Sequence, residues 1–255
     1  MENSVSSLEK GIDILSVYNL HNEPLSAQSI SKRLNMPLST AYRYLMTLEK
    51  RGFLIRNRET KDYKLGFMLF KLGNIVSSRM KLVDIILPYM KSLSSLSGET
   101  VWLTVVSGWE AVCIEIVEAD EVIKFSIERG VSLPLHAAAS SKILLAYQKD
   151  SFVNSMLKNT VFKRFTKKTI TDPFLLKKEL KRIRKQGFAF SDQEVYPGTR
   201  GIGAPVFNHK GKIVAGLTIA GPRERITDKK IPRFIQLVKE SALGASCELG
   251  YIEPR

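Results

Sequence analysis

Six polar side chains at helical spacing between residues 39 and 50 have the chemistry needed to contact a DNA duplex. They are Ser39, Thr40, Tyr42, Arg43, Thr47 and Lys50. An arginine can bridge O6 and N7 of a guanine, while hydroxyl groups can bond base edges or phosphate oxygens. The alternative is the solvated face of an ordinary three-helix unit, in which Arg and Lys are common. From the spacing alone we favour DNA recognition, although the preceding turn lacks a diagnostic glycine.

Two short helices joined by a tight turn at residues 35–37 are predicted to position these side chains. Ser26 and Ser39 each precede a helical pattern, and a serine at that place accepts a hydrogen bond from an unpaired first-turn N–H. Pro37 keeps the first helix from continuing, because it cannot donate an N–H. Gly52 ends the second helix, where a left-handed residue is preferred.

A β-hairpin, or wing, is predicted to follow these helices, because apolar stretches at 53–55 and 63–65 flank a charged segment. The basic residues of that segment are further candidate DNA contacts: Arg56, Arg58 and Lys61. An upstream apolar stripe over residues 8–18 supplies a third helix face, so that three helices can close one small core. We therefore expect residues 1–66 to form a winged helix-turn-helix unit.

The charge of the chain is strongly positive, with a net value of +14 and a pI of about 9.7. Residues 1–80 hold twelve Lys and Arg against seven Asp and Glu, and much of the remaining charge lies between Lys158 and Lys185. That run is more typical of a solvated helix face than of a second DNA site, although it raises the attraction to phosphate at long range. A nonspecific chromosome-coating protein would also suit this charge, but it leaves the rest of the chain unexplained.

The composition, 44% hydrophobic and 25% charged, is that of a globular protein, and 255 residues are enough for two domains. No stretch approaches the roughly 20 consecutive apolar residues of a membrane span. The opening MENSVSSLEKG lacks the basic-then-apolar layout of a secretion signal. We therefore expect a cytoplasmic protein with no membrane partner.

Cysteine and histidine give no sign of metal or disulfide chemistry. Cys113 and Cys247 are too few for a disulfide framework, and both are expected to be buried and inert. His21, His136 and His209 are too far apart for a local ligand set.

The sequence also lacks the common enzyme motifs: it has no GxSxG elbow, no dinucleotide fingerprint and no phosphate loop. We expect no metal, no cofactor and no enzyme activity; the alternative, an enzyme acting on a small acid, would require turnover of a carboxylate.

Beyond residue 66 the pattern predicts a connecting helix and then a domain of the α+β class, with the boundary between Gly66 and Leu82. The expected helices are 67–79, 82–97, 136–147, 152–166, 173–186 and 228–251. The expected strands are 101–105, 112–116, 122–126, 188–190, 201–207 and 212–220, with a loop at 129–134. Gly211 fits a hairpin turn that needs a positive φ.

Three stretches of the chain together resemble the IclR-type bacterial transcriptional regulators. They are SLEKGIDILSVY with the following STAYRYLMTLEKRGFL, then PLHAAASSKILLAY, and then QGFAFSDQEVYPGTRGIGAPVFNHKGKIVAGLTIAGP. The resemblance implies a winged helix-turn-helix domain over residues 1–66, a linker helix over 67–82 and a GAF-like effector-binding domain over 83–255. It implies a regulator, with a repressor of catabolic genes favoured, that binds double-stranded DNA as a homodimer or as a dimer of dimers.

The resemblance also implies a pocket for a small organic acid, and it nominates Ala139, Ser140, Ser141, Asp192, Gly201, Thr218 and Ala220. Ser140 and Ser141 are expected at a helix N-terminus, where N–H groups and the positive dipole end favour a carboxylate. Ala138, Ser141 and Ala220 depart from the family pattern, which would suit a different, larger or less polar effector. Asp192 is equally suited to a turn or a helix cap, whereas for His136, Glu194 and Gly198 a structural role is favoured.

Overall fold

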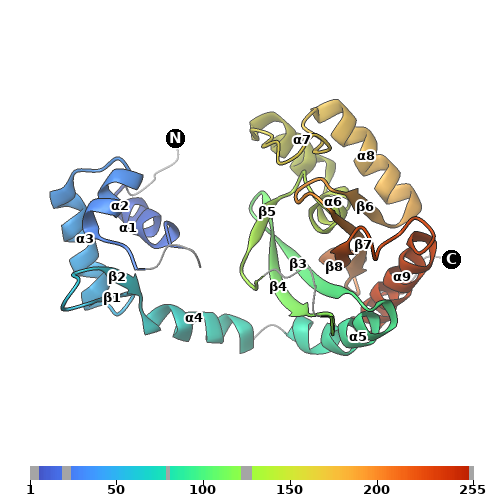
Figure 1. The fold of residues 1–255 in the computed structure, drawn as a ribbon, viewed down its shortest axis with the longest axis horizontal. Helices are drawn as coiled ribbons and strands as arrows, with labels where there is room; N and C mark the ends of the chain where they lie inside the picture. Colours follow the sequence, from blue (N-terminus) through green and yellow to red (C-terminus); the bar gives the residue numbers. More distant parts are fainter. Residues whose placement is uncertain (1–5, 19–23, 79–80, 122–127, 253–255) are drawn as a thin grey trace. The chain divides into compact units, whose positions relative to one another are not determined.

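A computed structural model of the chain describes residues 6–18, 24–78, 81–121 and 128–252 (Figure 1). The contacts divide the chain into two units, Met1–Met80 and Lys81–Arg255. The first unit contains helices α1 (Ser6–Ser16), α2 (Ala27–Arg33), α3 (Leu38–Lys50) and α4 (Phe67–Ser78), and the strands β1 (Leu54–Arg56) and β2 (Tyr63–Leu65). The three helices α1 to α3 and the β1–β2 hairpin confirm the predicted winged helix-turn-helix.

The first unit is closed by a small apolar core in which Ile14, Ile30, Leu45 and Tyr63 are fully buried. These residues come from α1, α2, α3 and β2, so each element contributes one face. Strands β1 and β2 pair antiparallel, with Leu54 opposite Leu65. The hairpin is therefore fixed to the helices through the same core.

One predicted helix cap is confirmed and the other is wrong. Ser26 caps α2, since its Oγ accepts a hydrogen bond from the Ser29 N–H at 3.1 Å. Ser39 does not cap α3: the helix begins at Leu38, and Pro37 occupies the cap position without a side-chain bond. Proline suits that position because its φ, here −56°, is fixed near the helical value and an N–H there would have no partner.

Two glycines join the end of α3 to the end of the wing. Gly52 has a φ of +75°, the left-handed conformation predicted for the end of the helix. A Cβ on Gly66 would lie 2.2 Å from the carbonyl oxygen of Gly52, well inside van der Waals contact. The Gly66 N–H also donates to the Phe53 carbonyl at 2.8 Å. Only glycine can occupy position 66 without moving the hairpin away from the helix.

The second unit is built on a sheet whose strands, among the described residues, follow the order β5-β4-β3-β8-β7-β6 and pair antiparallel. Their bounds are Thr100–Ser107 for β3, Glu110–Val117 for β4, Ser132–Pro134 for β5, Ala189–Asp192 for β6, Thr199–Phe207 for β7 and Ile213–Pro222 for β8. This arrangement confirms the α+β class. The predicted strand at 122–126 lies outside the described residues.

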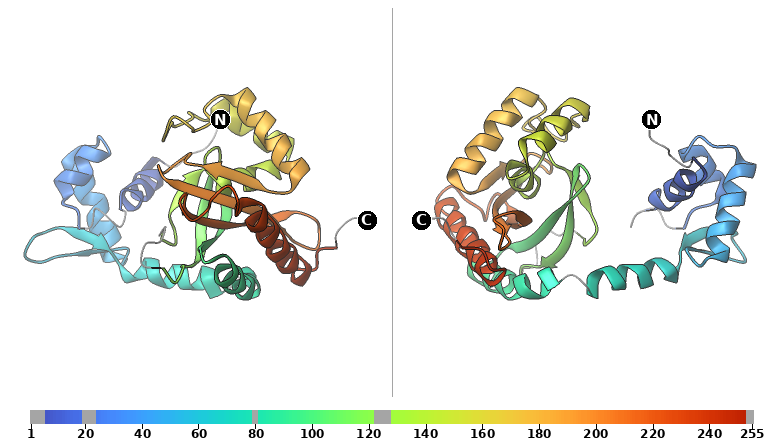
Figure 2. Two further views of the ribbon diagram at one scale, coloured as in Figure 1. Left: turned by 45° about the vertical axis from the view of Figure 1, so that its right-hand side comes forward. Right: turned by 180° about the vertical axis from the view of Figure 1, so that it is seen from behind.

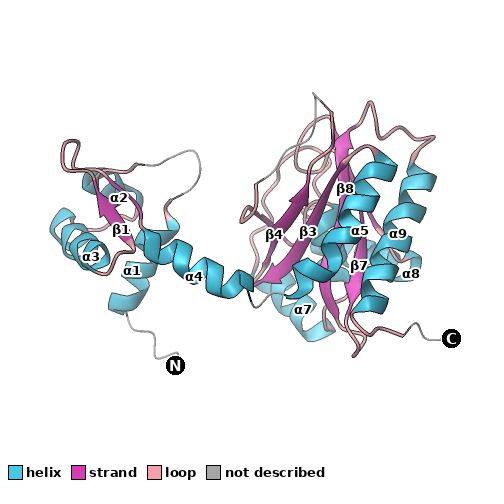
Figure 3. Ribbon diagram, turned by 90° about the horizontal axis from the view of Figure 1, so that it is seen from below, coloured by secondary structure: helices cyan, strands magenta, loops and turns pink. Residues whose placement is uncertain are grey.

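Helices cover both faces of this sheet. Helices α5 (Lys81–Ser97) and α9 (Ile231–Glu248) lie side by side on one face (Figure 3) and share a core with β3, β7 and β8. Helix α6 (Ala139–Ala146) lies against the other face, where α7 (Asp150–Asn159) and α8 (Pro173–Gln186) pack over it (Figure 2). Every residue of α6 is therefore buried.

Four predictions about this unit need correction. Part of the 129–134 loop is strand β5, because Leu133 pairs with Ala111 of β4. The helix predicted from 136 begins only at Ala139, since Ala138 has a φ of +71° that no helix continues. The helix predicted to reach 166 ends at Asn159, where the chain becomes extended. Cys247 is exposed rather than buried because it lies on the outer side of α9, whereas Cys113 is buried as expected.

Candidate functional site

The predicted DNA-binding face of α3 is open to solvent. Ser39, Arg43, Thr47 and Lys50 are exposed, and Thr40 and Tyr42 are half-buried. The opposite face of the helix is anchored through the buried side chains of Ala41 and Leu45. The Arg43 guanidinium lies 5.8 Å from the ring centroid of Tyr44, and the Thr47 hydroxyl donates to the Arg43 carbonyl at 2.9 Å. The helix therefore presents two cations and several hydroxyl groups from a rigid support.

The wing presents three further cations. Arg56, Arg58 and Lys61 are all exposed, as predicted. The turn between the strands is ordered by Asn57, whose side-chain oxygen accepts hydrogen bonds from the N–H groups of Glu59 and Thr60 at 2.8 and 3.2 Å. Strand β1 follows α3 closely and packs against it. This unit thus combines a polar helix with a basic hairpin, the arrangement with which winged helices contact base edges and phosphates.

A small pocket lies at the N-terminus of α6 in the second unit, with a volume of about 30 Å³. Five of the seven predicted effector residues line it: Ala139, Ser140, Gly201, Thr218 and Ala220. The strand register brings them together, because Gly201 of β7 lies opposite Ala220 of β8. Ser141 and Asp192 are not among the lining residues.

Glycine in β7 lets α6 approach the sheet closely beside this pocket. A Cβ on Gly203 would lie 2.9 Å from Thr218 Oγ1 and 3.3 Å from the Ala139 carbonyl oxygen. The first amide groups of α6 have no acceptor within the helix, as at any helix start. Within the described parts of the chain, Oγ1 of the lining residue Thr218 is buried without a hydrogen-bond partner. Ser141 Oγ is also buried and unpartnered, but Ser141 does not line the pocket. The first amide groups of α6 and the Thr218 hydroxyl are therefore the donors that a bound oxyanion would satisfy.

Ala138, noted above as a departure from the family pattern, also lines the pocket. Seven further lining residues were missed by sequence reasoning: Trp102, Leu133, Ser191, Val195, Tyr196, Thr199 and Arg200. Arg200 is the most informative of them, since it is only 6% exposed. A cation inside the otherwise apolar strand TRGIGAPVF must be paired if it is buried. That conflict between charge and surroundings is the signal that would have identified Arg200.

Arg200 is held by two carboxylates and a carbonyl. Its Nε lies 3.0 Å from Asp192 Oδ1, and its Nη1 lies 2.7 Å from Asp228 Oδ1 and 2.8 Å from the Ile226 carbonyl oxygen. Lys168 Nζ bonds the other oxygen of Asp192 at 2.5 Å. Burial raises the pKa of Asp192, but the bonds from Lys168 and Arg200 outweigh it and hold that pKa below its usual value. Asp192 is thus a charged partner of Arg200.

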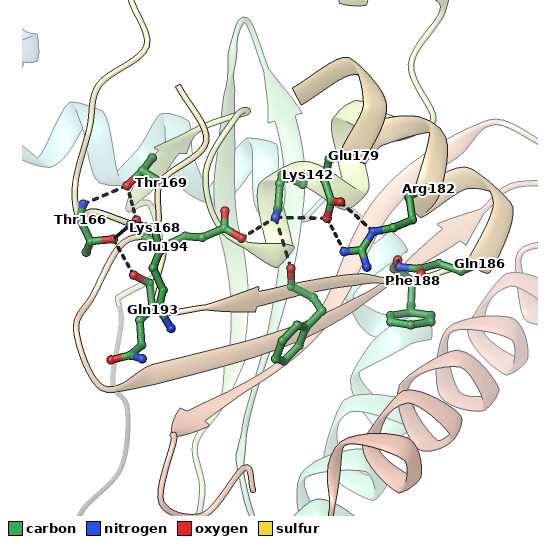
Figure 4. Close-up of polar contacts among 11 residues, drawn as sticks. Lys142, Thr166, Lys168, Thr169, Glu179, Arg182, Gln186, Phe188, Gln193 and Glu194 are labelled. Atoms are coloured by element: carbon green, nitrogen blue, oxygen red, sulfur yellow. Dashed lines mark hydrogen bonds and ion pairs between the residues drawn. The ribbon is translucent and has the colours of Figure 1, made fainter. Parts of the chain in front are cut away.

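A buried ion cluster supports the segment next to the pocket (Figure 4). The side chain of Lys142 is 1% exposed, and its Nζ contacts Glu194 Oε1 at 2.5 Å, the Phe190 carbonyl oxygen at 3.2 Å and Glu179 at 3.6 Å. Thr169 donates to the Glu194 carbonyl at 2.6 Å. Glu194 is therefore held from both its side chain and its backbone, next to the lining residue Val195, which agrees with the structural role favoured for it.

His136 has the packed environment that was favoured for it. Its ring is fully buried and meets the Phe162 ring edge-on, and Nε2 lies 3.0 Å from the Lys163 carbonyl oxygen. Burial lowers the pKa of His136, against smaller upward effects of the Lys163 carbonyl and of Glu194. The imidazole is consequently neutral at neutral pH, with Nε2–H as the donor.

Acidification is expected to destabilise the second unit through His136. Below the ordinary imidazole pKa of about 6.5 the unfolded chain takes up a proton that the folded protein excludes. The free energy of unfolding therefore decreases as the pH is lowered. The slope is at most about 1.4 kcal/mol per pH unit. Urea unfolding between about pH 5 and 7 should show it, and His136→Gln should flatten it, whereas the exposed His209→Gln should not. Equal slopes in all three proteins would contradict this assignment.

A polar helix with a basic wing, joined to a separate domain with a small pocket at a helix N-terminus, defines a ligand-responsive DNA-binding regulator. Comparison with known families supports this class. Residues 7–58 match the IclR helix-turn-helix domain, and residues 75–247 match the family described as bacterial transcriptional regulator IclR C-terminal. The chain belongs to the IclR family of transcriptional regulators, which are DNA-binding proteins and not enzymes.

Individual proteins show the same similarity over almost the whole chain. The repressor AllR of Salmonella typhi is 30% identical over 253 residues, which are 99% of this chain and 93% of AllR. The crystal structure of the Thermotoga maritima IclR is 34% identical, with a TM-score of 0.72, over 96% of this chain and 99% of that one. An IclR homolog from Microbacterium hydrocarbonoxydans, complexed with 4-hydroxybenzoate, shares the fold with a TM-score of 0.81 at 23% identity, over 95% and 98% of the chains.

Within the described residues, no group of three or more His, Cys, Asp or Glu side chains is placed to hold a metal ion. Among the helices of the same residues, none has the length and apolar character that crossing a bilayer requires.

Proposed function

We propose that this chain is a cytoplasmic repressor whose affinity for operator DNA changes when a small carboxylate binds at the N-terminus of α6. The observation that carries the proposal is the pocket itself, which is lined by the first residues of α6 and by Thr218, whose buried Oγ1 has no hydrogen-bond partner among the described residues. AllR, a similar protein, is a repressor by name, and the Microbacterium homolog was crystallised with an organic acid. Both support the same function here.

The size of the pocket narrows the class of effector. About 30 Å³ holds one or two water molecules, whereas pockets for drug-sized ligands have several hundred Å³. A carboxylic acid of two or three carbons requires the least opening. An aromatic acid requires Val195 and Tyr196, which line the pocket, to move outward. We therefore favour a short acid over the larger effector that the alanines at 138 and 220 would also suit.

Arg200 supplies a contact for this acid and also links the pocket to the segment before α9. Its described bonds use Nε and Nη1, so the two N–H groups of Nη2 are the donors left for a ligand. An anion bound there adds a negative charge beside Asp192 and Asp228, which weakens their hold on the guanidinium. Asp228 precedes α9, so this weakening shifts the balance between two arrangements of this segment. Effector binding then favours a different spacing of the DNA-binding units.

A homodimer is the assembly that the first unit supports. Apolar side chains are exposed along α1 and α4, among them Ile12 at 52%, Phe67 at 80% and Phe70 at 67%. A second copy of this unit would cover such a surface and would place two α3 helices on two half-sites of a palindromic operator. The family resemblance supports the same dimer and its pairing into a tetramer.

The experiment that tests the effector is a thermal-shift screen of the purified protein with acetate, pyruvate, malonate and 4-hydroxybenzoate. A ligand that binds only the folded state raises the Tm. We expect a short acid to raise it and to change the affinity for the promoter fragment beside the coding region, measured by fluorescence anisotropy.

Thr218→Val should abolish the Tm shift by removing the pocket hydroxyl, while Thr60→Val on the exposed wing should preserve it. If no acid alters either the Tm or promoter binding, the effector role is wrong, although DNA binding by α3 would stand.

A further inference from the structure

The positive charge of the second unit is confined to one segment. Residues 149–185 contain twelve Lys and Arg against three Asp and Glu, a net charge of +9. Residues 81–255 as a whole also have a net charge of +9, so the remainder of the unit is neutral on balance. Residues 1–80, which carry α3 and the wing, have a net charge of only +5. Most of the excess charge is therefore outside the DNA-binding unit.

The structure gathers this charge on the outer surface of α7, α8 and their connecting loop, which we name the basic face. All twelve Lys and Arg side chains of residues 149–185 are exposed. Helices α7 and α8 lie side by side (Figures 1 and 2), joined by contacts of Lys177 with Asn154 and of Arg184 with Asp150, both at 3.2 Å. The parts of the basic face on α7 and α8 are thus neighbours in the folded unit.

Helix α8 holds its part of the basic face rigidly. Asp172 caps its N-terminus by accepting from the Leu175 N–H at 2.8 Å, and Gly187 ends it in the left-handed conformation. Its buried residues Leu176, Leu180 and Ile183 belong to the core shared with α6. The lysines opposite this apolar stripe cannot turn inward.

Some cations of the basic face already have acidic partners. Arg182 pairs with Glu179, Arg184 with Asp150 and Lys168 with Asp192. Lys178, Lys181 and Lys185 form a ridge on one side of α8, and no ion pair within the described residues involves them. Like charges three or four residues apart on a helix repel each other and destabilise it. An external polyanion would remove that repulsion.

We propose that the basic face binds the phosphate backbone of duplex DNA, outside the base pairs that α3 contacts. Lysine, which supplies nine of the twelve cations, is a point charge suited to phosphates without sequence preference. From Lys178 to Lys185 the helix rises by about 10 Å, close to three steps of about 3.4 Å between successive phosphates of one strand. The chain belongs to a DNA-binding family, so duplex DNA is the polyanion that the rest of the chain is already built to bind. This second contact retains flanking DNA.

The test uses the full chain with Lys178, Lys181 and Lys185 all replaced by glutamine. Binding to a random-sequence duplex of about 40 bp is measured by anisotropy between about 50 and 200 mM salt. Each phosphate contact contributes about −0.9 to the slope of log K against log salt, so we expect the slope of the variant to be about two to three units less negative. Neither an operator nor an effector is needed, so the result is independent of the function proposed above.

The matched control removes the same charge elsewhere on the unit, at exposed lysines of the β7–β8 turn and before α9: Lys210, Lys212 and Lys230. Its slope should stay close to that of the unchanged protein. Equal slopes in the two variants would overturn the proposal, because net charge alone would then explain binding. Loss of binding to phosphatidylserine vesicles without loss on DNA would also overturn it, in favour of a membrane surface. Circular dichroism melting confirms that both variants fold.

Discussion

Arg43→Ala is expected to weaken binding to the promoter fragment by about 1–3 kcal/mol, the usual contribution of a bidentate contact to a base. Arg43 is exposed on the solvent face of α3, whose other face is anchored by Ala41 and Leu45. Truncation therefore removes a base contact without disturbing the fold. Anisotropy titrations with promoter and random-sequence duplexes at one salt concentration measure the effect.

The ratio of the two affinities separates base recognition from charge. A larger loss on promoter DNA than on random DNA means that Arg43 contacts a base. Equal losses would assign it to a phosphate, and no loss on either would contradict the placement of α3 on DNA. The exposed Arg223→Ala in the second unit is the matched control and should leave both affinities unchanged.

Lys142→Met is expected to destabilise the second unit by about 3–5 kcal/mol, because removing one member of a buried ion pair leaves the other charge uncompensated. The Glu194 side chain is only 8% exposed and, within the described residues, its Oε2 has no hydrogen-bond partner. Replacing Lys142 also removes the cation that pairs with Oε1 of this carboxylate. Urea unfolding followed by circular dichroism measures the loss of stability.

A second variant distinguishes the ion pair from simple loss of packing. Lys142→Met combined with Glu194→Gln should recover a large part of the stability, since the buried charge is then removed as well. Lys181→Met, on the exposed ridge of α8, should stay within about 0.5 kcal/mol of the unchanged protein. A double variant as unstable as Lys142→Met alone would show that the two charges are not coupled.

Local signals predicted the helices well wherever both ends carry a cap. Asp172 and Pro173 start α8 and Gly187 ends it, and the predicted range agrees with the structure. Helix α6 begins three residues later than predicted, because the left-handed conformation of Ala138 is imposed by its surroundings and alanine gives no sign of it. Tertiary structure decides such a position, and propensity does not.

The candidate site could be predicted only as far as its motifs reach. Gly201, Thr218 and Ala220 follow from the resemblance, and the structure places them around one pocket. Arg200 was missed because its pairing with Asp192 depends on the register between β6 and β7, and its pairing with Asp228 on where the chain leads after β8, neither of which a local motif reveals. The basic face was visible as a charge run, but the sequence does not reveal that every cation in it points outward.

The close approach of Gly66 to Gly52 bears on how operator preference can diverge among such proteins. Because a side chain at 66 would displace the hairpin, the wing and α3 form one DNA-binding element of fixed geometry. New operator sequences are then recognised by exchanging the exposed side chains of this element, and not by changing the angle between the wing and the helix. Transplanting the displayed residues between relatives should transfer their DNA preference, provided that both glycines are kept.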